Sequence, residues 1–82
     1  MVSKALNIIV SSPGQENIKF KLYPDTVLEK LMDKYAETII NKDPSQLDFV
    51  YEGIKVNKDS TPRSLGMIDG DIIKVNEIPI GG

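Results

Sequence analysis

The chain begins with two segments in which apolar and polar residues alternate. The first covers residues 6–11 and stops at Pro13 and Gly14, and the second covers residues 18–23 with lysines at its polar positions. A period of two is typical of half-buried strands, and a Pro-Gly pair is a turn signal. We therefore predict a β-hairpin whose second strand has a basic outer face.

Helical spacing replaces the alternation after Pro24. Thr26 with Glu29 three residues later fits a capping box, and the apolar residues that follow share one face. They are Leu28, Leu31, Tyr35 and Ile39, with Met32 and Ala36 beside them. This spacing predicts an amphipathic helix that opens at Thr26, ends before Asn41 and covers a sheet.

The second half of the chain returns to short strands. Glu52 with Gly53, and the run Asp69, Gly70 and Asp71, are turn signals. The elements predicted around them are strands at residues 47–51, 54–56 and 72–75, and one helical turn at residues 64–67. The order ββαββ, helical turn, β predicts an α+β domain of two layers. Residues 5–76 are expected to form the fold, and residues 77–82 a tail.

Composition narrows the function. A chain of 82 residues makes one domain, residues 1–82, and 40% hydrophobic with 27% charged residues is near the average for globular proteins. The absence of cysteine and histidine removes thiol chemistry and the commonest general base, so we expect neither an enzyme nor a cofactor. A net charge of −2 disfavours nucleic acid, and no apolar run suits a membrane or a secretory signal. We expect an intracellular monomer that binds proteins.

Three stretches of the second half carry a distinctive pattern. Residues 49–53 form an aromatic strand ending in Glu-Gly, residues 61–67 begin with Thr-Pro, and residues 71–73 read Asp-Ile-Ile. These stretches resemble the SUMO family, and residues 19–21 and 28–35 resemble its first half, so the resemblance covers residues 5–82. It implies the ubiquitin-like β-grasp fold, with a mixed sheet packed against one main helix, and a nuclear location.

The resemblance implies a surface for the SUMO conjugating enzyme. SUMO docks non-covalently on a basic patch of that enzyme, so charge complementarity is the implied mechanism. The residues carried over to this role are Glu52, Gly53, Gly66, Met67, Asp69 and Asp71. Asp48 stands where SUMO usually has arginine. Without the resemblance, the same residues read as ordinary solubilising acids and turn glycines.

The resemblance also implies a groove between the second strand and the helix. In SUMO this groove takes an extended hydrophobic and acidic peptide as an added strand at a sheet edge. The corresponding residues are Ile18, Lys19, Phe20, Lys21, Leu22, Lys30, Leu31 and Lys34. Thr38 replaces the arginine of the groove, so we expect SUMO-interacting peptides to bind weakly. Alternatively, the apolar residues are plain core and the lysines a solvated face.

Gly81 and Gly82 leave two functions open. A chain without side chains can thread an enzyme tunnel and expose its carboxylate for acyl transfer, which favours a mature SUMO modifier attached to target lysines through Gly82. In contrast, the preceding Ile78, Pro79 and Ile80 differ from the polar lead of SUMO. Of the two functions we therefore favour the second. In it, the chain is an integral SUMO-like domain of a DNA-repair or genome-stability scaffold protein, which docks on the conjugating enzyme without being conjugated.

Overall fold

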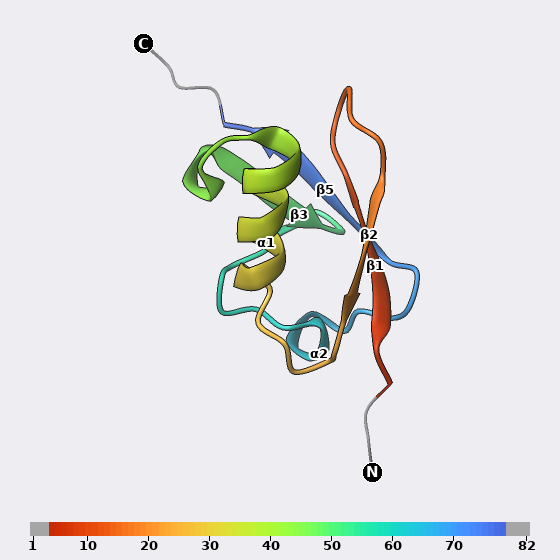
Figure 1. Ribbon diagram of the computed structural model, residues 1–82. Helices are drawn as coiled ribbons and strands as arrows, with labels where there is room; N and C mark the ends of the chain where they lie inside the picture. The colour runs from red at the N-terminus through yellow and green to blue at the C-terminus, as the bar shows by residue number, and fades with distance from the viewer. Residues whose placement is uncertain (1–3, 79–82) are drawn as a thin grey trace.

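A computed structural model describes residues 4–78 of the chain (Figure 1). The predicted order of strands and helices is confirmed. In chain order the elements are β1 (Leu6–Ser11), β2 (Ile18–Leu22), α1 (Glu29–Tyr35), η1 (Ala36–Ile40), η2 (Pro44–Gln46), β3 (Leu47–Tyr51), β4 (Ile54–Lys55), α2 (Pro62–Leu65) and β5 (Ile72–Glu77). The architecture is therefore the α+β arrangement that the periodicities predict.

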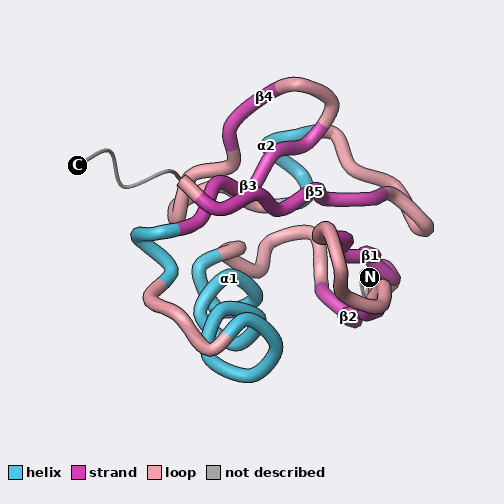
Figure 2. Tube along the Cα trace, turned by 90° about the horizontal axis from the view of Figure 1, so that it is seen from above, coloured by secondary structure: helices cyan, strands magenta, loops and turns pink. Residues whose placement is uncertain are grey.

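The strands form one mixed sheet in the order β2-β1-β5-β3-β4. The central pair, β1 and β5, is parallel, and the other pairs are antiparallel. Helix α1 covers one face of the sheet (Figure 2). Among the described residues β2 has β1 as its one strand neighbour, so the expectation that β2 lies at a sheet edge is confirmed.

A single hydrophobic core lies between the sheet and α1. Tyr35 of α1 is fully buried, and its ring meets that of Phe49 of β3 edge-on, with 6.3 Å between the ring centroids. The central strands add Ile8, Val10, Ile73 and Val75, all at most 1% exposed. The residues between them, such as Ile72 and Lys74, therefore point to the outer face of the sheet, which α1 leaves open.

The predicted capping box at Thr26 and Glu29 is wrong. Helix α1 begins at Glu29 without a side-chain cap, and the hydroxyl of Thr26 accepts a hydrogen bond from the Tyr23 N–H instead. The first N–H groups of the helix donate to the loop before α2: Leu28 to the Ser60 carbonyl at 2.8 Å and Glu29 to the Lys58 carbonyl at 3.2 Å. Backbone carbonyls distant in sequence thus replace the local cap.

The helical run continues past α1 as the wider turn η1. It ends at Asn41, which has a left-handed φ of 63° and donates its N–H to the Ala36 carbonyl. The predicted extent of the helical segment is thus confirmed at its C-terminal end. No helix within residues 4–78 combines the length and the apolar character needed to cross a membrane.

Helix α2 begins two residues before the predicted turn at residues 64–67. A capping box places it: the Thr61 hydroxyl accepts the Ser64 N–H at 3.0 Å, and the Ser64 hydroxyl accepts the Thr61 N–H at 2.9 Å. Pro62 suits the first helical position, because the missing N–H would have no partner there. The prediction missed this box because serine replaces the usual Glu or Gln at its last position.

Strand β5 is longer than predicted. It continues through Asn76 and Glu77, which pair with Asp48 and Leu47 of β3, and the N–H of Ile78 donates to the Gln46 carbonyl at 2.9 Å. Glu77 also forms an ion pair with Lys42, in the loop after η1. Glu77, expected as the first residue of the tail, is therefore part of the sheet.

Candidate functional site

A hollow of about 330 Å³ lies between the ends of β3 and β5 on the outer face of the sheet. Glu52, Gly53 and Asp71, three of the residues predicted to face the conjugating enzyme, line this hollow. They come from two turns that are about twenty residues apart in sequence. We call this feature the outer-face hollow.

The turn between β3 and β4 presents Glu52 to solvent. Tyr51 pairs with Ile54, which leaves Glu52 and Gly53 as a two-residue loop. Both residues have positive φ values, 49° and 79°, which is the signature of a type I′ hairpin turn and explains the glycine at the second position. No described cation lies within ion-pair distance of Glu52, so its carboxylate is free to meet a partner.

Asp71, in contrast, is engaged within the fold. Its Oδ2 atom accepts hydrogen bonds from the Tyr51 hydroxyl at 2.6 Å and from the Ile68 N–H at 2.9 Å. Tyr51 is a buried residue of β3, so the Asp71 carboxylate fixes the turn before β5 to the end of β3. Asp71 therefore shapes the outer-face hollow, and reversing its charge would disturb the fold as well as any partner contact.

The bond between Tyr51 and Asp71 predicts an effect of pH. Donation to the carboxylate, followed by desolvation and the charge of Asp71, raises the pKa of Tyr51 to about 12. This pKa lies above the ordinary value of 10.0. The contribution of the Tyr51–Asp71 hydrogen bond to the stability of the fold is therefore fully present below about pH 10 and is lost as the pH rises through 12. At about pH 11 we expect the NMR signal of the Tyr51 ring carbon Cζ to report a protonated hydroxyl.

Asp71→Asn supplies the variant for this measurement, and Asp69→Asn is the matched control. The first should bring the Tyr51 titration down toward its ordinary range, and the second should leave it in place. A Tyr51 that titrates near pH 10 in the unaltered chain contradicts the bond.

The other residues predicted to face the conjugating enzyme lie outside the lining of the hollow. Gly66 ends α2 with a φ of 70°, and the Met67 side chain is 6% exposed and belongs to the core. The Oδ1 atom of Asp69 accepts hydrogen bonds from the backbone N–H and the side-chain amide of Asn7, at 2.7 and 3.0 Å. These residues hold the turns in place.

Three outward-pointing side chains of the outer-face hollow were not predicted. Val50, Ile72 and Lys74 line it, and Ile72 is 46% exposed. All three occupy the outward positions of β3 and β5, where strand alternation leaves side chains in solvent. The signal was therefore present in the period of two, but the pairing of β3 with β5 was needed to bring the residues together.

The residues of the predicted peptide groove divide between surface and core. Lys19 and Lys21 of β2 are exposed, Ile18 and Phe20 are half-buried against the core, and Leu22 is buried. On the helix, Lys30 and Lys34 are exposed, and Leu31 is 2% exposed. Leu22 and Leu31 therefore support the groove from inside and offer little surface to a peptide.

The structure also shows where the two residues that depart from the SUMO pattern, Thr38 and Asp48, lie. Thr38, at the position of the groove arginine, is exposed on η1. Asp48 lies in β3, and its carboxylate is 3.4 Å from the Lys55 ammonium across the β3–β4 hairpin. Asp48 is therefore compensated within the sheet. The glycines of the predicted conjugation site, Gly81 and Gly82, lie outside the described residues.

No cluster of metal-ligating side chains is present within residues 4–78. The two acids that line the outer-face hollow have different roles. Glu52 forms no ion pair with a described residue, whereas Asp71 accepts hydrogen bonds from Tyr51 and Ile68. The hollow thus offers a partner one free carboxylate, the exposed side chain of Lys74 and the apolar side chains of Val50 and Ile72.

Two sequence comparisons match most of the chain. The family described as "Ubiquitin-2 like Rad60 SUMO-like" matches residues 6–76. A curated relative, the "Small ubiquitin-related modifier" of Caenorhabditis elegans, is 30% identical over 77 residues, which are 94% of this chain and 84% of the relative. The predicted resemblance to SUMO is confirmed.

Solved structures agree on the fold. Ubiquitin from Caldiarchaeum subterraneum has a TM-score of 0.81 at 20% identity and covers 95% of this chain and 99% of its own. A protein described by the words "Molecular Mimicry of SUMO promotes DNA repair" has a TM-score of 0.76 at 16% identity, with 93% and 95% covered. The predicted ubiquitin-like β-grasp fold is confirmed.

Proposed function

Because the chain belongs to the Rad60 SUMO-like family of ubiquitin-like proteins, we propose that it is a protein-interaction domain that docks non-covalently on the SUMO conjugating enzyme. Members of this family are protein-interaction or modifier domains, and the domain proposed here acts by binding rather than by catalysis. The docking face is the outer-face hollow with its free carboxylate, Glu52.

One observation carries this proposal. Glu52, Gly53 and Asp71 match the SUMO pattern at separate points of the sequence, and all three line the same hollow. The apolar side chains of Val50 and Ile72 beside Glu52 add area that a partner can remove from water. This combination of apolar surface and a free acid suits a basic patch on a partner.

Charge reversal at Glu52 tests the docking face. Since Glu52 is exposed and forms no ion pair with a described residue, Glu52→Lys should leave the fold intact. It should weaken binding of the conjugating enzyme about 5-fold, because exposed charge pairs are each worth about 0.2–1 kcal/mol and reversal adds repulsion. Calorimetry at low ionic strength measures the effect.

Glu37→Lys is the matched control, because Glu37 is an exposed acid on η1, on the helix side of the molecule. It makes the same charge change and should leave the affinity within a factor of about two. Equal weakening by the two substitutions would show that net charge, and not this face, determines binding.

A second function is favoured by the identity of 30% with a small ubiquitin-related modifier over 84% of its length. In this alternative the chain is itself a modifier, attached to target lysines through Gly82. It differs from the first in requiring activation of the Gly82 carboxylate, which an ATP-dependent loading assay measures.

Family membership supports a nuclear location and a parent protein in SUMO-dependent DNA repair or genome stability, and we include both in the proposal. The partners proposed are the conjugating enzyme and, more weakly, SUMO-interacting peptides at the β2 edge. Thr38 is the reason for the weaker binding, because it cannot supply the charge-assisted hydrogen bond of an arginine. We propose that the domain acts as a monomer.

A further inference from the structure

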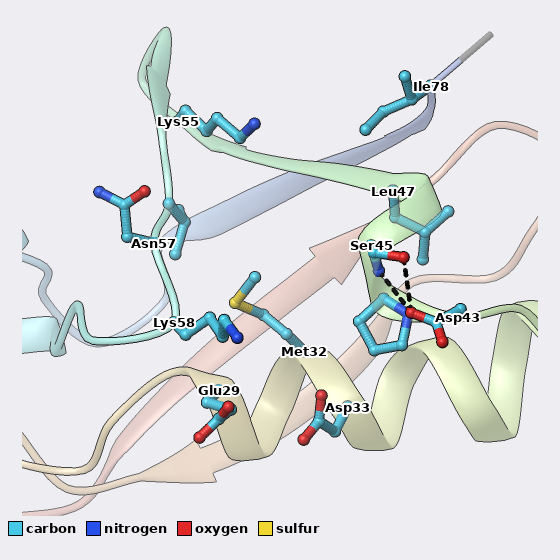
Figure 3. Close-up of a pocket in the computed structure, with 12 residues that line it drawn as sticks. Glu29, Met32, Asp33, Asp43, Ser45, Leu47, Lys55, Asn57, Lys58 and Ile78 are labelled. Atoms are coloured by element: carbon cyan, nitrogen blue, oxygen red, sulfur yellow. Dashed lines mark hydrogen bonds between the residues drawn. The ribbon is translucent and has the colours of Figure 1, made fainter. Parts of the chain in front are cut away.

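A second hollow lies on the other side of the fold, between α1 and the sheet (Figure 3). Its volume is about 440 Å³, which is within the range of about 300–1,000 Å³ typical of ligand pockets. Its walls come from α1, the turn at residues 43–45, β4 with the loop after it, and Ile78. We call it the helix-side hollow. It shares no lining residue with the outer-face hollow or with the predicted peptide groove.

The bottom of the helix-side hollow is apolar. Met32, Leu47 and Val56 line it and are 8%, 4% and 2% exposed, so they are core residues whose small exposed areas form the bottom of the hollow. Figure 3 shows Met32 extending from α1 into the space below β3 and β4. These three side chains expose little area themselves. The half-buried side chains of Pro44 and Ile78, which line the same hollow, supply apolar area that a partner's apolar side chain can remove from water.

The helix wall of the hollow is acidic. Glu29 and Asp33 are four residues apart on α1 and therefore share a face, and Figure 3 shows both on the lower side of the opening. Within residues 4–78 neither carboxylate belongs to an ion pair. Glu29 is in the first turn, where an acid interacts favourably with the helix dipole, but Asp33 lies beyond it.

Asp43 adds a third carboxylate beside Pro44. Its Oδ1 atom accepts hydrogen bonds from the N–H and the hydroxyl of Ser45, at 2.9 and 2.8 Å. These bonds lower the pKa of Asp43, so it is ionised at neutral pH. The ammonium of Lys55 is paired with Asp48, which lies outside the hollow, and Lys58, whose carbonyl accepts the Glu29 N–H, is the remaining cation of the lining. Three carboxylates therefore line the hollow against two cations, and two of the carboxylates lie on α1.

We propose that the helix-side hollow binds an extended segment of a protein partner in which a bulky apolar residue is flanked by lysine or arginine. The apolar side chain occupies the space above Met32 and Val56, and the flanking cation lies against Glu29 and Asp33. This charge preference is opposite to that of the groove beside β2, which presents lysines.

A peptide pair tests the proposal. The capped peptides Gly-Lys-Leu-Phe-Lys-Gly and Gly-Glu-Leu-Phe-Glu-Gly differ only in the sign of their charges. Added to the ¹⁵N-labelled chain, the basic peptide should shift the amide signals of Met32, Asp33, Val56 and Asn57. The acidic peptide should bind there at least about 5-fold more weakly, which follows from two reversed charge pairs.

Substitutions in the protein distinguish recognition of the peptide's charge from nonspecific binding. The double variant Glu29→Gln with Asp33→Asn should weaken the basic peptide about 5-fold, with unchanged circular dichroism. Glu37→Gln, a neutralised acid outside this hollow, should change the affinity less than 2-fold. Either of two results overturns the proposal: shifts that avoid the hollow or do not occur, or equal binding of the two peptides.

Discussion

Replacing Phe49 by alanine is expected to lower the free energy of unfolding by about 3–5 kcal/mol. Phe49 is 1% exposed, lies in β3 next to the central strand and meets the ring of Tyr35 edge-on. A domain of 82 residues has roughly 4–12 kcal/mol of stability in total. The substitution therefore removes a large share of it, because the cavity opens where α1 contacts the sheet.

Urea unfolding followed by circular dichroism measures this loss. Ile54→Ala is the control, since Ile54 is 58% exposed on β4, and its effect should stay within about 0.5 kcal/mol. If the two substitutions cost the same, the core is not where the structure places it.

Loading of Gly82 onto an activating enzyme is expected to be slow or absent. An activated tail must thread extended past the enzyme, but Pro79 fixes its own φ, restricts Ile78 and has no N–H to donate. The structure adds a reason, because the N–H of Ile78 is already bonded to Gln46 beside β3. Replacing residues 78–80 by Gln-Gln-Thr should therefore raise the loading rate about tenfold, the equivalent of one restored hydrogen bond.

An ATP-dependent thioester assay, with an established SUMO as the positive control, measures both rates. Efficient loading of the unaltered chain would favour the covalent modifier over the interaction domain. Since this assay depends on the tail and not on Glu52, its outcome is independent of the docking test.

Local sequence patterns predicted the strands well and the starts of the helices poorly. Alternation of period two placed β1 and β2, because one face of each strand is buried against the core. The start of α1 was wrong because its first N–H groups bond to the carbonyls of Lys58 and Ser60, about thirty residues away. The end of β5 was missed for a similar reason, since Asn76 and Glu77 are polar and their pairing with β3 is a tertiary contact.

The sequence pattern brought together three residues of the outer-face hollow but did not give the role of each residue. The family pattern placed Glu52, Gly53 and Asp71 together, and the structure places all three around one hollow. The sequence did not reveal that Asp71 is held by Tyr51, whereas Glu52 remains free. The helix-side hollow was not predicted at all, because its walls come from four separate segments.

The most direct test of the docking proposal is an NMR titration of the ¹⁵N-labelled chain with unlabelled SUMO conjugating enzyme. The proposal predicts saturable shifts at the amides of Val50, Gly53, Gly70 and Ile72, which line the outer-face hollow, while the amides of β2 and α1 stay in place. A spectrum that does not change, or that changes at β2 and α1 but not at the hollow, would contradict it.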